Sequence, residues 1–129
     1  MRLVNLKDTD WILNLMNQPS VRKASVISVF NGTHLITKKE NEKYWKKILK
    51  QKDFQAYSIN KLGLIKINKG NIGIVIDEKH RRKGLAYNNL KKLIKKGYKA
   101  EIRTNNKASI KLFKKLGFKE KVRIYTYDI

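Results

Sequence analysis

The chain has 129 residues, and 31 Lys or Arg against 10 Asp or Glu give it a net charge of +21 at pH 7. This length suits one domain, and a hydrophobic fraction of 41% is enough for one core, which excludes a disordered basic tail. The absence of Cys excludes a disulfide scaffold, a thiol nucleophile and a Cys-based zinc site, and two His residues make no metal cluster. No apolar run approaches the roughly 18 residues of a membrane span, and the first residues lack a signal core. We expect a single cytoplasmic domain over 1–129 that needs no metal.

The positive charge is concentrated in the second half, where residues 70–129 hold 17 basic and 5 acidic side chains. Such a charge attracts polyanions, among them nucleic acids, phosphorylated cofactors and nucleotide-linked substrates. Most of the basic residues are Lys, however, and the chain is also rich in Ile and Asn, so a compositional bias with solvated helix faces explains much of the excess. Specific base reading uses Arg and aromatic platforms, which are sparse here. A nucleic acid partner is therefore possible but not favoured.

Hydrophobic periodicity and turn residues predict a chain that alternates helices with short strands. In the first half we expect a strand at 2–6, a helix over about 8–18, irregular chain over 20–36 with room for a strand at 26–30, and a helix over about 38–50. Pro19 ends the first of these helices, and Thr37 with Glu40 forms a capping box that opens the second.

The second half is predicted to hold most of the sheet. We expect strands at 54–59, 64–68 and 71–77, a helix over 84–96, a strand at 100–104, a helix from Asn106 to Gly117 and a last strand at 120–129. The third strand is nearly continuously apolar, which is typical of burial on both faces. This order predicts an α/β fold with a mixed central sheet and helices on both faces.

The chemistry is expected where the strand at 71–77 leads through a basic loop into a helix. The first amides of a helix have no intrahelical partners, and the helix dipole adds positive charge to them. Gly84 lets the backbone approach a ligand closely, and Arg81, Arg82 and Lys83 add full charges. The result is an anion cradle that suits a pyrophosphate, although a solvated helix start would have the same sequence. The loop matches neither the Walker pattern nor GxGxxG, which argues against a P-loop ATP site and an NAD fold.

Two motifs resemble the GNAT superfamily of acetyl-CoA-dependent N-acetyltransferases. Residues 81–86, RRKGLA, fit the R/Q-x-x-G-x-G/A signature, and residues 106–118, NKASIKLFKKLGF, are similar to the family element N-x-x-A/S-x-x-L-Y/F-x-K-x-G-F. The second motif alone is also explained as a helix stop at a Gly. The spacing of one helix and one strand between them suits this fold, and the resemblance covers about residues 54–129. It implies an acyltransferase with the GNAT fold that uses acetyl-CoA as its donor.

The resemblance also implies roles for individual residues. The strand backbone would pair with the pantetheine arm, the loop and helix start would hold the pyrophosphate, and the second motif would contact the rest of the cofactor. The implied cofactor-binding residues are Ile74, Val75, Ile76, Arg81, Arg82, Lys83, Gly84, Leu85, Ala86, Asn106, Ser109 and Phe113. The backbone N–H of Ile76 would also support the oxyanion during direct transfer to an amine.

The sequence departs from the family at two catalytic positions. Phe113 stands where many members have a Tyr that protonates the leaving thiolate, and Asn71 stands where many have a Glu that helps to deprotonate the amine. Neither replacement can move a proton. Tyr125 remains a candidate acid, and His80 and His34 have the right pKa range for a base, although a lone loop His is often only a surface residue.

The acceptor is predicted from the first half. The pattern N-x-P-x-V-R at residues 17–22, followed by a capped helix with a Trp, resembles GNAT enzymes that acetylate nucleotide-linked amino sugars or protein N-termini. The residues that would line the acceptor side are Arg22, Ser25, His34, Trp45, Tyr57, Asn71 and Tyr125, although Trp45 and Tyr57 also suit the core. We expect a small and anionic amine, such as a nucleotide-linked amino sugar, and a monomer or homodimer. The alternatives are acetylation of a protein N-terminus, a ribosomal protein or an RNA-linked amine, and a degenerate module that binds CoA or RNA without turnover.

Overall fold

The computed structural model describes residues 1–24 and 35–127. Its sheet has the order β1-β2-β3-β4, and all three pairs of neighbouring strands are antiparallel. The strands are β1 (Arg2–Leu3), β2 (Phe54–Ile59), β3 (Gly63–Asn68) and β4 (Asn71–Ile76). The predicted strands at 54–59, 64–68 and 71–77 are thus found within one residue. Since β4 pairs with β3 alone, its other side is an edge of the sheet.

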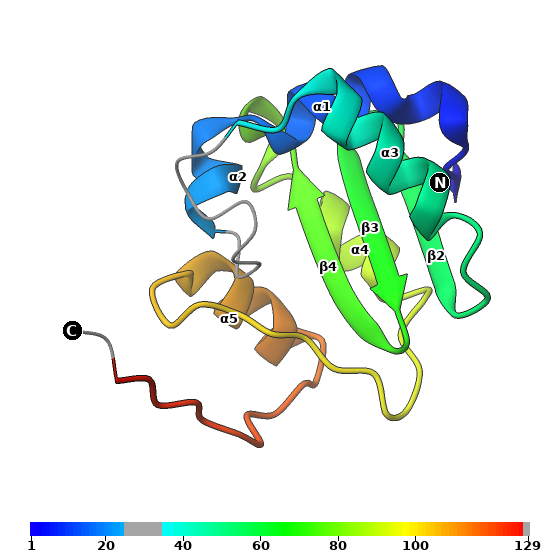
Figure 1. Cartoon of the computed structure of the whole chain (residues 1–129). Coiled ribbons are helices and arrows are strands. Elements are labelled where there is room, and N and C mark those ends of the chain that lie inside the picture. The colour runs from blue at the N-terminus through cyan, green and yellow to red at the C-terminus, as the bar shows by residue number, and fades with distance from the viewer. Residues whose placement is uncertain (25–34, 128–129) are drawn as a thin grey trace.

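Helices cover both faces of this sheet, as the sequence predicts (Figure 1). The first face carries α1 (Thr9–Met16) and α3 (Lys38–Ile48), and the second carries α4 (Leu85–Leu90) and α5 (Lys107–Lys115). Three short elements connect them: the 3₁₀ helices η1 (Leu6–Asp8) and η3 (Glu78–His80), and the helix α2 (Pro19–Ala24). No helix among the described residues is long and apolar enough to cross a membrane.

Each face of the sheet has its own hydrophobic cluster, because side chains alternate along each strand. On the first face, Ile12 of α1 and Trp45 of α3 bury against Phe54 and Leu64, and the rings of Trp45 and Phe54 meet edge to face at 6.0 Å. On the second face, Leu90 and Phe113 pack on the Ile residues of β3 and β4. The two clusters hold β4 between helical layers and fix the direction in which its free edge points.

The start of the chain differs from the prediction in two places. The expected strand at 2–6 ends after two residues, because the Asn5 side chain accepts from the Lys7 amide at 2.8 Å and so opens η1. The chain expected to be irregular from residue 20 begins with the helix α2 instead, and Pro19 is its first residue. Proline lacks an N–H that the first turn of a helix does not need, so it ends one helix and opens the next. The strand suggested at 26–30 lies outside the described residues.

The helix expected over 84–96 is also shorter, since α4 ends at Leu90 and continues as turns. The Asn89 side chain donates to the Leu85 carbonyl oxygen at 2.7 Å, and such side-chain bonds compete with helical backbone bonds.

The two C-terminal strands are not formed in the described residues. In place of the strand at 100–104 there is one parallel bridge, in which Lys99 pairs with Asn71 of β4, so the mixed character of the sheet is reduced to this bridge. Residues 120–127 are extended without a strand partner, and Ile124 and Tyr127 are 79% and 89% exposed. Each of these strands needs the other as a neighbour, and alternation in the sequence does not ensure that the pair forms.

Candidate functional site

The free edge of β4 presents backbone groups to a ligand. The amide of Ile72 points outward, since it donates to the carbonyl oxygen of Lys99 at 2.8 Å, whereas the amide of Asp77 points back to Leu62 of the neighbouring hairpin at 2.7 Å. Backbone groups alternate between the two sides of a strand. The amides of Ile74 and Ile76 therefore point outward too.

This direction divides the three strand residues that the family resemblance assigns to the cofactor. The backbone of Ile74 and Ile76 faces the free edge, as a ligand lying beside β4 requires. Val75 faces β3 in the register, where it is paired with Leu64. The assignment of the Val75 backbone to the pantetheine arm is therefore corrected, and its side chain packs against the cluster on the first face.

The loop between β4 and α4 has two backbone turns in the left-handed region. Arg82 has φ +64° and Gly84 has φ +76°, and Gly84 is the N-cap residue of α4. A Cβ atom on Gly84 would lie 3.2 Å from Asn88 Nδ2, so a larger residue is both strained and crowded there. Leu85 and Ala86 follow as the first residues of the helix, whose first amides have no intrahelical acceptors. The loop thus turns sharply beside the end of β4.

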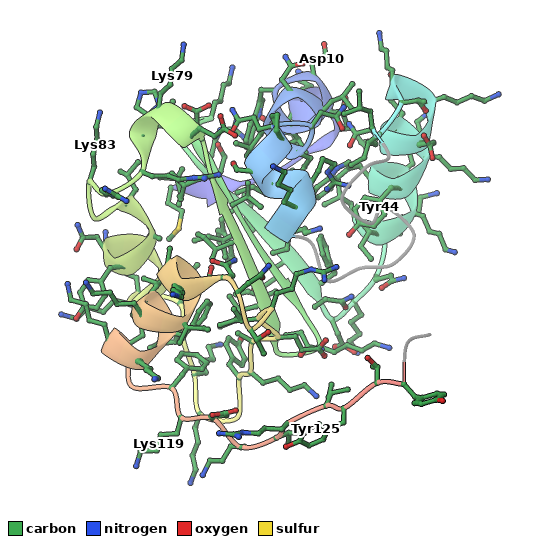
Figure 2. The ribbon with its side chains drawn as sticks, turned by 90° about the vertical axis from the view of Figure 1, so that its left-hand side faces the viewer. Asp10, Tyr44, Lys79, Lys83, Lys119 and Tyr125 are labelled. Carbon is green, nitrogen blue, oxygen red and sulfur yellow. The ribbon has the colours of Figure 1, made fainter. Side chains whose placement is uncertain are left out.

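Three cations of this loop are exposed. Arg81 is tied to the strand, because its Nε donates to the carbonyl oxygen of Ile76 at 3.0 Å, whereas Lys83 extends away from the body of the protein (Figure 2). Together with Arg82 they surround a row of backbone amides with positive charge. This arrangement can hold an elongated ligand that carries phosphate at one end and amide groups along the rest. No group of three metal-ligating side chains occurs among residues 1–24 and 35–127.

A contact that the sequence does not reveal fastens α2 to the same loop. Gln18 Nε2 donates to Asp77 Oδ1 at 2.5 Å, and the Glu78 amide donates back to Gln18 Oε1 at 3.1 Å. Ser20 Oγ donates to Glu78 Oε1 at 2.6 Å. These partners are about 60 positions apart in the chain, so local pattern alone could not find them. As a result, α2 begins next to the end of β4.

His80 is held by a carboxylate. Its Nδ1 lies 2.7 Å from Asp77 Oδ2, and the hydrogen bonds from His80 and Gln18 lower the pKa of Asp77. A carboxylate on Nδ1 fixes the orientation of the imidazole ring. Of the candidate bases, His80 is the one whose surroundings the structure describes, since His34 lies outside the described residues.

The residues expected to line the acceptor side do not come together as a group. Arg22 is only 3% exposed, with its Nε donating to the Met16 carbonyl oxygen at 2.7 Å. Trp45 is 2% exposed and belongs to the core. Tyr57 packs with the cluster on the second face, opposite the one that carries α1 and α3, and so does not share a cavity with Arg22. Ser25, like His34, is not among the described residues.

Asn71 opens β4 beside the hairpin turn, at the end of the strand remote from the loop 77–84. Its side-chain oxygen Oδ1 is buried without a hydrogen-bond partner among the described residues. The alternation in the strand places Asn71, Gly73 and Val75 toward the first face. The position of the missing Glu is thus on the face that carries α1 and α3, together with Lys66 of β3, a residue that the sequence pattern did not single out.

The second family motif forms α5 and has a structural part. The Asn106 side chain accepts from the Ser109 amide at 3.2 Å and so caps the helix. Phe113 is 5% exposed and meets Phe118 edge to face at 5.1 Å. Contact of these residues with a cofactor stays a prediction, whereas their contribution to the helix and the core is visible.

Tyr125, the candidate acid, lies in the extended C-terminal segment and is 86% exposed. Figures 1 and 2 place this segment at the opposite end of the molecule from the loop that carries Lys83. We therefore expect the Tyr125→Phe variant to keep its rate of acetyl transfer within about twofold, because this hydroxyl lies far from the leaving group. Steady-state kinetics over pH 6–9 check this, and a tenfold fall in kcat without a change in stability would contradict it.

Comparison with known proteins agrees with this geometry. A family model described as acetyltransferase (GNAT) domain matches residues 1–119. Solved structures that resemble the chain include an N-acetyltransferase from Staphylococcus aureus Mu50, with 24% identity, a TM-score of 0.69, and coverage of 92% of this chain and 81% of that one. An acetyltransferase of the GNAT family from Streptococcus pneumoniae has 20% identity and a TM-score of 0.65, covering 90% and 81% of the two chains. The F149G mutant of the spermidine N-acetyltransferase SpeG from Vibrio cholerae has 17% identity and a TM-score of 0.70, covering 94% and 79%. No curated protein matches the chain at a significant level.

Proposed function

Because the chain belongs to the GNAT acetyltransferase family, we propose that it transfers an acetyl group from acetyl-CoA directly to a primary amine of a small molecule, such as a nucleotide-linked amino sugar. The observation that carries this proposal is the outward direction of the Ile74 and Ile76 amides beside the sharp turn at Gly84. The turn also carries three exposed cations, so an extended ligand with a phosphate end fits both parts.

The residues that would hold acetyl-CoA follow from this fit. The backbone of Ile74 and Ile76 would bind the amide groups of its arm. Its phosphates would lie against the amides of the loop and of the α4 start, with the side chains of Arg81, Arg82 and Lys83 beside them. When bound, acetyl-CoA supplies a thioester as the source of the acetyl group.

The Ile76 amide has the direction that oxyanion stabilisation needs. The attacking amine forms a bond to the acetyl carbon, the carbon–sulfur bond breaks, the amine loses a proton and the sulfur gains one. Negative charge gathers on the carbonyl oxygen meanwhile, and a fixed N–H donor pointing at that oxygen lowers the barrier. The rest of the rate would come from holding the two reactants together.

For the proton that the amine loses, we propose His80 with Asp77. The 2.7 Å contact between them orients the imidazole, and the pair lies directly after the strand that carries Ile76. Asn71 and Phe113 have no proton to exchange at neutral pH, so the two positions that serve many relatives are not used here.

The experiment that tests this function mixes the protein with acetyl-CoA and a panel of primary amines and follows the release of free thiol. We expect thiol release above the hydrolysis blank with at least one amine, together with a product whose mass is higher by one acetyl group, about 42 Da. Measurable CoA binding without any thiol release would overturn the proposal and favour a CoA-binding protein without turnover.

A further inference from the structure

Lys66 stands on an uncovered part of the first face. In the register of the sheet it is directly opposite Gly73 of β4, an exposed residue without a side chain. A Cβ atom on Gly73 would find no other atom within 4 Å. The side chain of Lys66 is half-buried all the same, and its Nζ lies 3.5 Å from the hydroxyl oxygen of Tyr44 on α3 and 5.2 Å from the centre of that ring. It thus lies between α3 and an open stretch of the strand edge.

A second cation lies on the same side. Burial and the charge of Arg22, on α2, lower the pKa of Lys66 to about 8. Burial lowers the pKa of Arg22 as well. The groups that face Lys66 from the elements packed against it are therefore Arg22 from α2 and the neutral Tyr44 from α3.

No carboxylate among the described residues shifts the pKa of Lys66, and residues 25–34 contain no Asp or Glu. Two like charges drawn together out of water cost free energy unless an anion accompanies them. An anionic ligand would lower this cost, because it would interact with both charges at once.

The position of the two cations links them to the reacting atoms. Gly73, opposite Lys66, is three residues before Ile76 on the same strand, a distance of about 10 Å along β4. α2, which carries Arg22, is fastened to Asp77 and Glu78 directly after Ile76. A molecule whose amine reaches the Ile76 end of β4 can therefore place a group several bonds away beside Lys66.

We propose that Lys66 and Arg22 bind an anionic oxygen group, a carboxylate or a phosphate, carried by the acceptor amine. This inference rests on the proposed function and adds to it a class of acceptor. One structural neighbour is a spermidine N-acetyltransferase, and spermidine is a polycation. This chain puts two positive charges on its acceptor side, so it selects against such amines.

A matched series of amines tests the selection. Hexylamine, 1,6-diaminohexane and 6-aminohexanoate share one chain and differ in the charge at the far end, and glucosamine 1-phosphate adds a phosphate. We expect kcat/KM to be at least about tenfold higher for 6-aminohexanoate than for 1,6-diaminohexane, since a charge-assisted bond replaces a repulsion. Comparison of the carboxylate with the phosphate then shows which anion fits better.

Variants at Lys66 separate recognition from packing. In Lys66→Met the ratio of kcat/KM between the anionic and the neutral amine should fall about tenfold, whereas Lys66→Arg should keep most of the ratio because it keeps the charge. Lys43→Met removes an exposed Lys of α3 and is the control, with all ratios unchanged. Wild-type preference for 6-aminohexanoate should decline above pH 8 as Lys66 loses its proton, and Lys66→Arg should not show this decline.

A binding measurement keeps this inference distinct from the proposed function. N-acetyl-6-aminohexanoate is an unreactive product analogue, and calorimetry in the presence of CoA gives its affinity without turnover. Affinity that depends on the charge at position 66 supports the inference even if no amine is acetylated, which would overturn only the function. Turnover with equal use of all three hexyl amines, or a preference that Lys66→Met does not alter, overturns the inference alone.

Discussion

The Gly84→Val variant is expected to bind CoA at least about tenfold more weakly than the wild type. Gly84 has φ +76°, and an added Cβ would lie 3.2 Å from Asn88 Nδ2. A β-branched residue costs roughly 1–2 kcal/mol in the left-handed region, so the turn shifts and carries the loop amides with it. Titration calorimetry with CoA measures the loss.

The control for this variant is Gly97→Val. Gly97 has φ +91° and no atom within 4 Å of an added Cβ, so it bears the same kind of backbone strain without crowding. It belongs to the turns that follow α4 rather than to the loop that precedes this helix. We expect a similar loss of stability with little change in CoA affinity. Equal affinities for Gly84→Val and the wild type would show that the loop does not bind the phosphates.

The second large effect is on stability, and it concerns Asp8. This residue is 2% exposed and accepts from the Asn5 amide and from Trp11 Nε1, both at 2.8 Å. Arg2, at 2.6 Å, adds an ion pair from β1. Asp8→Ala leaves the two buried donors without an acceptor, which lowers the free energy of unfolding by about 2 kcal/mol. Because the Arg2 side chain is half exposed, water screens its charge and the ion pair adds little to this figure.

Urea unfolding of the variant measures this loss, with Glu120→Ala as the control. Glu120 pairs with Arg123 at 3.0 Å, but both side chains are more than half exposed, so we expect a change below about 0.5 kcal/mol. The hydrogen bonds hold the pKa of Asp8 well below its usual range. The stabilisation is therefore complete above the ordinary Asp pKa of about 4 and is lost as the pH falls below it. A difference between wild type and variant that persists unchanged at pH 2 would contradict this account.

Local features of the sequence predicted most of the fold that positions the site. The capping box at Thr37 and Glu40 forms as expected, with the Glu40 amide donating to Thr37 Oγ1 at 3.1 Å. The hairpins of β2, β3 and β4 follow from their turns and their apolar residues. Each of these depends on neighbours within a few positions, which a single sequence displays.

What could not be predicted depends on residues far apart in the chain. The sequence does not say that Gln18 meets Asp77, or that Lys66 lies beside Arg22. The face to which Tyr57 belongs is within reach of the sequence, because this residue alternates with the buried Ala56 and Ser58, but the family pattern of the first half points elsewhere. The C-terminal strands failed for a related reason, since alternation describes one strand and says nothing of its partner.

The attachment of α2 to the loop after β4 joins two surfaces that act on different ligands. Gln18 and Ser20 hold Asp77 and Glu78, so a shift of the loop around a phosphate moves the start of the helix that carries Arg22. Two ligands that bias one connected element must alter each other's affinity by the same factor. We therefore expect the donor and the acceptor to bind cooperatively, with CoA raising the affinity for the second molecule as much as that molecule raises the affinity for CoA.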